Sequence, residues 1–152
     1  MKVIEYDPKY KKDFIDFNKT WIIDYFGSLE DEDYEVFGKL EEKLEHGAMI
    51  YFAIENNEAL ATCMVKPIDN KNTWEICKLA SNKHKNHKGC GSAVFEAAMK
   101  YAIAHGAKRI LLVTNTILKP AIHIYEKYGF TEYIPEDCGY SRVDIAYEKF
   151  ID

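Results

Sequence analysis

Two glycines one residue apart, in the segment Asn86-His87-Lys88-Gly89-Cys90-Gly91-Ser92, constrain the fold of this chain more than any other feature. A strand-like run precedes the segment and a helical pattern follows it. Glycine adopts backbone conformations that other residues resist, and it leaves the surface of a loop free of side chains. Exposed N–H groups would then converge at a helix N-terminus, where the partial positive charge favours a phosphate. The segment predicts a phosphate-binding loop, and an unliganded glycine turn is the alternative.

Two familiar phosphate loops fit the segment poorly. A Walker-type P-loop carries Lys-Ser/Thr after its second glycine, whereas Gly91 is followed by Ser92-Ala93. A dinucleotide fingerprint carries a third glycine where this chain has Val94. The pattern Q/R-x-x-G-x-G/A, which holds the pyrophosphate of coenzyme A, fits both glycines. Its first position is Asn86 here, which keeps an amide but loses reach and charge, so we expect somewhat weaker anchoring of the cofactor.

Hydrophobic periodicity predicts an α/β fold around this loop. We expect strands at Lys2–Tyr6, Met49–Ile54, Ala59–Val65, Trp74–Ala80, Arg109–Thr114, Thr131–Ile134 and Arg142–Phe150. We expect helices at Tyr10–Phe26, Tyr34–Leu44, Ser92–His105 and Leu118–Tyr128. An early hairpin and a crossover helix between two parallel strands make the predicted sheet mixed. The chain has no repeat or linker, and we expect one domain over residues 1–152.

Apolar residues at three- and four-residue steps define the predicted buried face of each N-terminal helix. On the first helix they are Phe14, Phe17, Trp21, Ile22 and Tyr25. On the second helix they are Tyr34, Phe37, Leu40 and Leu44. The acidic run at residues 30–33 precedes this second helix and suits a helix N-terminus. In the last strand, one face is expected to carry Val143, Ile145, Tyr147 and Lys149.

Charge and composition exclude several partners. The net charge of −5 gives no basic field for nucleic acid or anionic lipid, so we expect neither as a partner. No run approaches the ~18 apolar residues that cross a bilayer, and residues 1–16 have no features of a secretory leader. The four cysteines are spread singly, which favours a reduced protein. These features predict a cytoplasmic location.

Four segments together resemble one enzyme family. They are Glu75–Ser81, the glycine loop, Thr114-Asn115 and Ala121–Phe130. The last segment is similar to the signature N…A-I-x-L-Y-E-K-x-G-F of the GNAT family of acetyl-CoA-dependent N-acetyltransferases. The resemblance implies a mixed, mostly antiparallel sheet, splayed between its fourth and fifth strands, at Trp74–Ala80 and Arg109–Thr114. It also implies helices on both faces of the sheet and acetyl-CoA as the co-substrate.

The resemblance assigns roles to individual residues. Tyr125 matches the general acid for the coenzyme A thiolate, and Glu75 matches the base for the acceptor amine. The backbone N–H groups of Leu79 and Ser81, on either side of Ala80, match those that hold the pantetheine arm and the thioester oxygen. The pyrophosphate would be held by Asn86, His87, Lys88, Gly89, Cys90, Gly91 and Ser92. Asn115 matches an asparagine that contacts the cofactor.

Each assignment has a structural alternative. Glu75 can be an ion-pair partner of Lys78 or a solvated strand residue, Tyr125 can be core packing, and Asn115 can belong to a turn or cap a helix. His84, His87 and Cys90 superficially resemble a zinc site, but no fourth ligand follows nearby, and we expect no metal. Cys90 at a helix N-terminus can also be a nucleophilic thiol, although phosphates bound to the loop would cover it.

The expected reaction is direct acetyl transfer, in a ternary complex, to a primary amine of a small molecule or peptide. A non-catalytic sensor of acyl-CoA and an acetyltransferase that acts on a protein are the alternatives. Because relatives often dimerise, the resemblance allows a homodimer.

Overall fold

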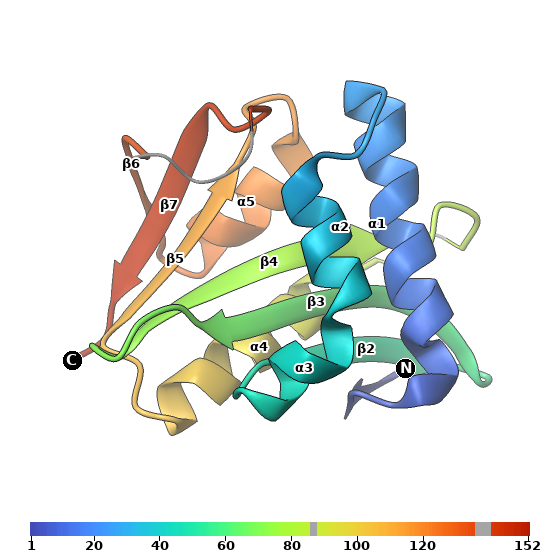
Figure 1. Cartoon of the computed structure of the whole chain (residues 1–152), viewed down its shortest axis with the longest axis horizontal. Coiled ribbons are helices and arrows are strands. Elements are labelled where there is room, and N and C mark those ends of the chain that lie inside the picture. Colours follow the sequence, from blue (N-terminus) through green and yellow to red (C-terminus); the bar gives the residue numbers. More distant parts are fainter. Residues whose placement is uncertain (86–87, 136–140) are drawn as a thin grey trace.

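The computed structural model describes residues 1–85, 88–135 and 141–152 (Figure 1). In these residues, seven strands form one mixed sheet in the order β1-β2-β3-β4-β5-β7-β6. The strands are β1 (Lys2–Glu5), β2 (Met49–Glu55), β3 (Glu58–Pro67), β4 (Thr73–Ser81), β5 (Arg109–Thr114), β6 (Thr131–Tyr133) and β7 (Ile145–Phe150). Among the strands of the described residues, only β4 and β5 pair in parallel, so the sheet is mixed and mostly antiparallel, as predicted.

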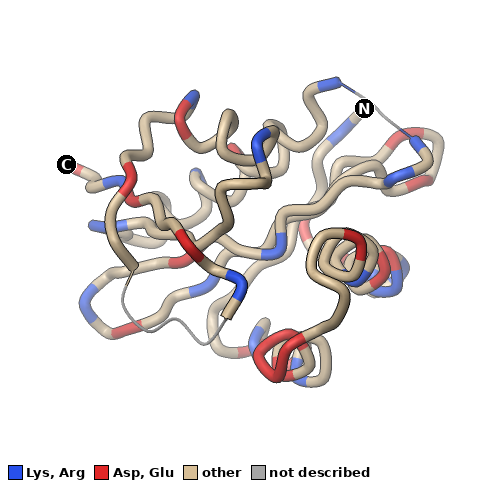
Figure 2. The backbone as a smooth tube through the Cα atoms, turned by 90° about the horizontal axis from the view of Figure 1, so that it is seen from above, with Lys and Arg blue, Asp and Glu red and all other residues tan. Residues whose placement is uncertain are grey.

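Helices cover both faces of the sheet. They are the short 3-10 helix η1 (Pro8–Tyr10), α1 (Lys11–Phe26), α2 (Asp31–Gly38), α3 (Leu40–Glu45), α4 (Cys90–Ala104) and α5 (Lys119–Lys127). Figure 2 looks nearly along α1 and α2 and shows both helices on the same side of the sheet. The helices α4 and α5 lie on the opposite side (Figure 1). This arrangement confirms the predicted helices on both faces.

Each face of the sheet has its own apolar core. The larger core packs α4 and α5 against the sheet through residues such as Val94, Phe95 and Tyr125. The second core packs α1, α2 and α3 through residues such as Phe14, Val36 and Leu40. Because both cores hold fully buried aromatic or branched side chains, the sheet between them is a rigid base for the strand ends.

The two parallel strands stay together over only part of their length. Their register pairs Thr73 with Arg109, Trp74 with Ile110 and Glu75 with Leu111, and it ends there. Beyond Glu75, β4 continues beside β3, whereas β5 continues beside β7. The predicted splay between the fourth and fifth strands is therefore confirmed.

The structure corrects the predicted buried faces of the N-terminal helices. Tyr25 is 53% exposed and Tyr34 is 60% exposed, although both were expected in the core. The buried positions of α2 are instead Asp33, Val36 and Phe37. Apolar periodicity missed Asp33 because a buried carboxylate is rare unless a partner compensates its charge, and the sequence names no such partner.

Two predicted elements differ from the structure by more than two residues. The single second helix is divided into α2 and α3, since Lys39 between them has a φ of −122° and ends α2. The last strand begins at Ile145 rather than at Arg142. Residues 142–144 are instead held by the end of β5, where the Asn115 side chain donates to the Arg142 carbonyl at 2.7 Å and Asp144 N–H donates to the Thr114 carbonyl at 3.1 Å.

Candidate active site

The splay of the sheet opens into a cleft of about 320 Å³. Its walls come from β4, the end of β5, the first turn of α4, the helix α5, the last turn of α1 and residues 142–143. The cleft brings together Glu75, Leu79, Ala80, Ser81, Gly91, Asn115 and Tyr125 from the predicted site. Volumes of this order are typical of sites for small molecules and cofactors.

Strand β4 contributes a free edge and a bulge to the cleft. In the register of β3 and β4, Thr62 pairs with Ala80 and Met64 with Cys77, so Lys78 and Leu79 together face one residue of β3. Lys78 has a φ of +54°, in the left-handed region that residues with a side chain rarely adopt. Such a bulge bends the strand and re-aims its peptide groups. Leu79, Ala80 and Ser81 follow it along the cleft.

The glycine loop ends at the first turn of α4. Gly89 caps this helix with a φ of +89°, a conformation that favours glycine. Gly91 lines the cleft, and a Cβ at this position would lie 3.4 Å from Ile124 Cδ1. Lys88 is exposed and Ser92 is half-buried. Asn86 and His87 lie outside the described residues, so the predicted pyrophosphate loop is described only from Lys88 onward.

Cys90 faces away from this surface. The residue is 4% exposed, and its thiol lies 3.9 Å from the Leu60 carbonyl on the inner side of α4. A buried thiol that faces the core is poorly placed to be a nucleophile. The structure therefore favours the interpretation of Cys90 as a small core residue.

Tyr125 combines core packing with a place on the cleft. Its ring lies 5.4 Å from that of Phe95 and 5.8 Å from that of Tyr147, and the residue is 7% exposed. Burial raises the pKa of its hydroxyl well above the ordinary value, and a hydrogen bond with Thr114 opposes this rise only in part. At neutral pH the hydroxyl is therefore protonated.

Glu75 and Asn115 occupy the two strands that separate. The Glu75 carboxylate lies 3.5 Å from Lys66 Nζ, and its side chain is 17% exposed. Its ion-pair partner is thus Lys66 and not Lys78, which binds Asp33. Asn115 donates to the Arg142 carbonyl and accepts from Ile117 N–H at 3.0 Å, so it organises the turn after β5 and holds the next segment.

A model of the acetyltransferase (GNAT) family matches residues 14–130, which is most of the chain. The chain belongs to the GNAT acetyltransferase family. It is therefore an acyltransferase, and the resemblance seen in its motifs is confirmed. None of the curated protein sequences matches this GNAT chain.

Solved structures of GNAT proteins have the same fold at low sequence identity. A GNAT acetyltransferase from Staphylococcus aureus Mu50 is 20% identical with a TM-score of 0.84, and 99% of each chain is covered. The protein yncA from Salmonella typhimurium, with its cofactor acetyl-CoA, is 13% identical with a TM-score of 0.80, covering 100% of this chain and 94% of that one. PaiA N-acetyltransferase from Thermoplasma acidophilum, in complex with coenzyme A, is 17% identical with a TM-score of 0.74, covering 99% and 100%.

One wall of the GNAT cleft was not predicted as part of the site. Trp21, Tyr25 and Phe26, at the end of α1, line the cleft opposite β4. The Arg142 guanidinium lies 5.7 Å from the Trp21 ring and 6.0 Å from the Phe26 ring. The available signal was the cluster of aromatic residues before Gly27, which the helical pattern assigned to the core.

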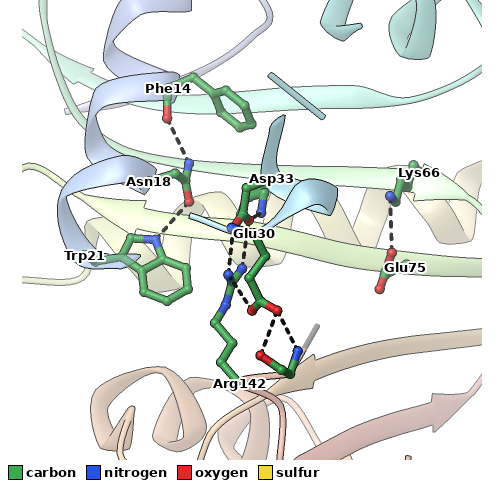
Figure 3. Close-up of polar contacts among 10 residues, drawn as sticks. Phe14, Asn18, Trp21, Glu30, Asp33, Lys66, Glu75 and Arg142 are labelled. Carbon is green, nitrogen blue, oxygen red and sulfur yellow. Dashed lines mark hydrogen bonds and ion pairs between the residues drawn. The ribbon is translucent and has the colours of Figure 1, made fainter. Parts of the chain in front are cut away.

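A group of charged side chains lies beside this wall (Figure 3). The Arg142 guanidinium donates to both carboxylate oxygens of Asp33, at 2.7 and 2.8 Å, and to Glu30 at 3.2 Å. Burial alone would raise the pKa of Asp33, but hydrogen bonds from Arg142 and the charge of Lys78 outweigh it and lower the pKa to about 2. Asp33 is therefore ionised at any physiological pH.

Neither metal binding nor membrane insertion has support in the part of the chain that the structure describes. In residues 1–85, 88–135 and 141–152, no three His, Cys, Asp or Glu side chains are grouped to hold a metal ion. His84 is exposed, and the third member of the zinc pattern, His87, lies outside these residues. No helix among the same residues is long and apolar enough to cross a bilayer.

Proposed function

We propose that this GNAT enzyme transfers the acetyl group of acetyl-CoA directly to a primary amine of a small molecule or peptide. The observation that carries the proposal is the cleft between β4 and β5, where the free edge of β4, the first turn of α4 and Tyr125 meet. Two proteins of similar fold were solved with acetyl-CoA or coenzyme A. Residues 1–152 would act as one catalytic domain.

We expect acetyl-CoA to bind in the cleft in one orientation. Its pyrophosphate would lie at the N-terminus of α4, where Gly89 exposes backbone N–H groups and the helix dipole favours negative charge. The pantetheine arm would pass Gly91, whose missing side chain leaves a cradle that a Cβ would fill. The thioester would then reach the peptide groups of Leu79 and Ser81, beyond the point where β5 leaves β4.

Transfer requires three proton movements. The acceptor ammonium first loses one proton to Glu75. The amine nitrogen then bonds to the thioester carbonyl carbon and loses its second proton to water as the carbon–sulfur bond breaks. The departing thiolate takes a proton from the Tyr125 hydroxyl, so the products are the acetamide and coenzyme A. The Tyr125 hydroxyl is protonated at neutral pH and is therefore a proton source when the thiolate forms, although burial raises its pKa and makes it a weaker acid than an exposed tyrosine.

Glu75 is the proposed base on the opposite side of the cleft. An amine of lysine type has a pKa near ~10.4, so its proton must be removed before attack at neutral pH. Glu75 lines the cleft from β4, and its carboxylate can take this proton directly or through a water molecule. The nearby Lys66 ammonium holds the carboxylate in place on the strand surface.

The acceptor would enter past the end of α1. Trp21, Tyr25 and Phe26 form an aromatic wall there, and Tyr25 is exposed enough to meet an incoming molecule. Aromatic faces attract ammonium groups and apolar chains, which suits an amine with a carbon skeleton. A cytoplasmic location is a further prediction from the sequence, and a homodimer is what the family resemblance allows.

Calorimetric titration with acetyl-CoA, coenzyme A and ATP tests the proposal first. We expect saturable binding of acetyl-CoA and coenzyme A and no binding of ATP. A panel of primary amines is then screened for acetyl-CoA-dependent release of free thiol. Absence of acetyl-CoA binding would contradict the proposal, and binding without turnover on any amine or peptide would favour the sensor alternative.

A further inference from the structure

The carboxylate of Asp33 binds one residue from each of two walls of the cleft, Lys78 of β4 and Arg142. Its side chain is fully buried and accepts a hydrogen bond from Lys78 Nζ at 2.5 Å. The same carboxylate accepts two hydrogen bonds from Arg142, which lines the opposite side (Figure 3). Asp33 also accepts from Glu30 N–H at 2.9 Å, in the first turn of α2, so its own position is fixed.

Lys78 has an unusual backbone conformation for its residue type. It sits in the bulge of β4 with a φ of +54°, next to Leu79, whose peptide group is proposed to hold the thioester. For a residue with a Cβ, the left-handed backbone conformation is about tenfold less populated than the right-handed one. Such conformations persist where the surroundings hold them, and they are common at functional sites.

The side chain of Lys78 is the feature that can hold this conformation. It runs inward, is only 3% exposed and ends at the Asp33 carboxylate, with the Phe37 ring 5.5 Å from its Nζ. Burial lowers the pKa of Lys78, and the Asp33 charge opposes this effect. Because a buried ion pair is a poor source of stability compared with apolar packing, its use here points to a positional purpose.

We propose that Asp33 is a positioning residue for acetyl transfer: it anchors Lys78 in the left-handed conformation and thereby aims the peptide groups of the β4 bulge at the acetyl thioester. The inference rests on the proposed function, because it concerns the same binding surface. Through Arg142, the same carboxylate also keeps residues 142–143 at the edge of the cleft, so one buried group sets the relative position of both walls.

Two substitutions of Lys78 separate positioning from stability. Lys78→Ala and Lys78→Gly remove the same ammonium group and differ only in the Cβ. Glycine adopts a positive φ freely, whereas alanine must leave the bulge conformation for part of the time. Since a ligand that binds one conformer loses affinity in proportion to that conformer's population, we expect the Kd for acetyl-CoA to rise about tenfold in Lys78→Ala. In Lys78→Gly it should stay within about threefold of the wild type.

A role in stability alone would leave the Kd unchanged in both variants. Calorimetry well below the unfolding temperature measures binding by the folded protein, so a lower melting temperature in either variant would not by itself raise the Kd. Equal Kd values in the two variants, or a higher value in Lys78→Gly, would therefore overturn the inference. If the wild-type protein itself fails to bind acetyl-CoA, the proposed function falls and the inference falls with it, which is a separate outcome.

Asp33 itself is tested in both backgrounds. Asp33→Asn should raise the Kd for acetyl-CoA about tenfold in the wild-type chain and less than threefold in the Lys78→Gly background, where no anchor is needed. A matched control is Asp24→Asn, which removes the exposed Asp24–Lys83 ion pair at 2.9 Å and should leave the Kd unchanged. An equal loss from Asp33→Asn in both backgrounds would show that Asp33 does not act through Lys78.

Discussion

The two walls of the cleft are built in different ways. Along β4 and the first turn of α4, backbone conformation creates the surface: Lys78 and Gly89 have positive φ values, and Gly91 leaves room for a ligand. Along α1, α2 and residues 142–143, side chains create it, through aromatic rings and the Asp33–Arg142 ion pair beside them. The first wall faces the proposed co-substrate, and the second faces the proposed acceptor.

This difference suggests how enzymes of one fold can keep the same co-substrate while they differ in the acceptor. A surface made of backbone groups can bind acetyl-CoA in the same manner in enzymes of different sequence, because each peptide group offers the same N–H donor. A surface made of side chains can be exchanged residue by residue without moving the strands. We infer that acceptor specificity resides in the wall formed by Trp21, Tyr25, Phe26 and Arg142.

The largest expected effect comes from the proposed acid on the first wall. Tyr125→Phe keeps the ring packing against Phe95 and Tyr147 but removes the proton donor. We expect kcat to fall by about 10²–10⁴-fold, with acetyl-CoA affinity almost unchanged. Steady-state kinetics and calorimetry give the two values.

Tyr128→Phe is the matched control for this experiment. Tyr128 lies on the same side of the fold, but its hydroxyl donates to Glu96 at 2.8 Å, outside the cleft. The kcat of the Tyr128→Phe variant should equal that of the wild type. Similar losses of kcat in both variants would mean that packing, and not proton donation, is the role of Tyr125.

Substitutions in the second wall should lower the free energy of unfolding rather than the rate of acetyl transfer. Arg142→Met leaves the Asp33 carboxylate without its bidentate partner, and breaking a buried pair costs about 3–5 kcal/mol. Lys83→Met removes a cation from an exposed pair with Asp24 and should cost at most ~1 kcal/mol. Chemical denaturation measures both, and equal losses would contradict the importance of the buried group.

Acid should weaken the same wall. Asp33 has a pKa of about 2 in the folded protein, against about 3.9 in an unfolded chain. A carboxyl with a lowered folded pKa stabilises the protein fully above the unfolded pKa, and this contribution is lost as the pH falls towards 2. We expect a loss of roughly 2–3 kcal/mol between pH 4.5 and pH 2 from this group.

Denaturation midpoints at a series of pH values test this loss. The Asp33→Asn variant should show a smaller decrease over the same range, since its amide does not titrate, whereas Asp24→Asn should follow the wild type. An Asp33→Asn variant with the wild-type acid dependence would show that other carboxyl groups cause the loss.

The sequence predicted the first wall well and the second wall poorly, for a physical reason. Glycines at fixed spacing, strand runs and the segment Ala121–Phe130 are local patterns, because backbone-built surfaces need particular residue types at particular positions. They predicted the order of elements along the chain, and the family resemblance that they carry implied the splay between β4 and β5. By contrast, Arg142 and Asp33 are 109 residues apart, and no local pattern links them.

Periodicity also misled where a helix extends past the sheet. Phe14 and Ile22 are buried as predicted, but Tyr25 at the end of α1 lies over the cleft and is exposed. A hydrophobic pattern cannot distinguish a core from a ligand-binding wall, since both are apolar. In the same way, closeness in sequence suggests Lys78 as a partner for Glu75, whereas in the structure the Lys78 side chain binds Asp33.

The smallest expected effect is steric and belongs to the first wall. Gly91→Val places a branched side chain in the cradle, where even a Cβ would contact Ile124 at 3.4 Å. We expect the Kd for acetyl-CoA to rise about tenfold, which corresponds to about 1.4 kcal/mol of binding free energy, because the extra methyl groups occupy the proposed path of the pantetheine arm. Gly38→Val, at the end of α2 with no atom near its Cβ position, should leave the Kd unchanged. If Gly91→Val binds acetyl-CoA as well as the wild type does, the ligand does not pass this residue, and the backbone-built wall must serve another part of the substrate.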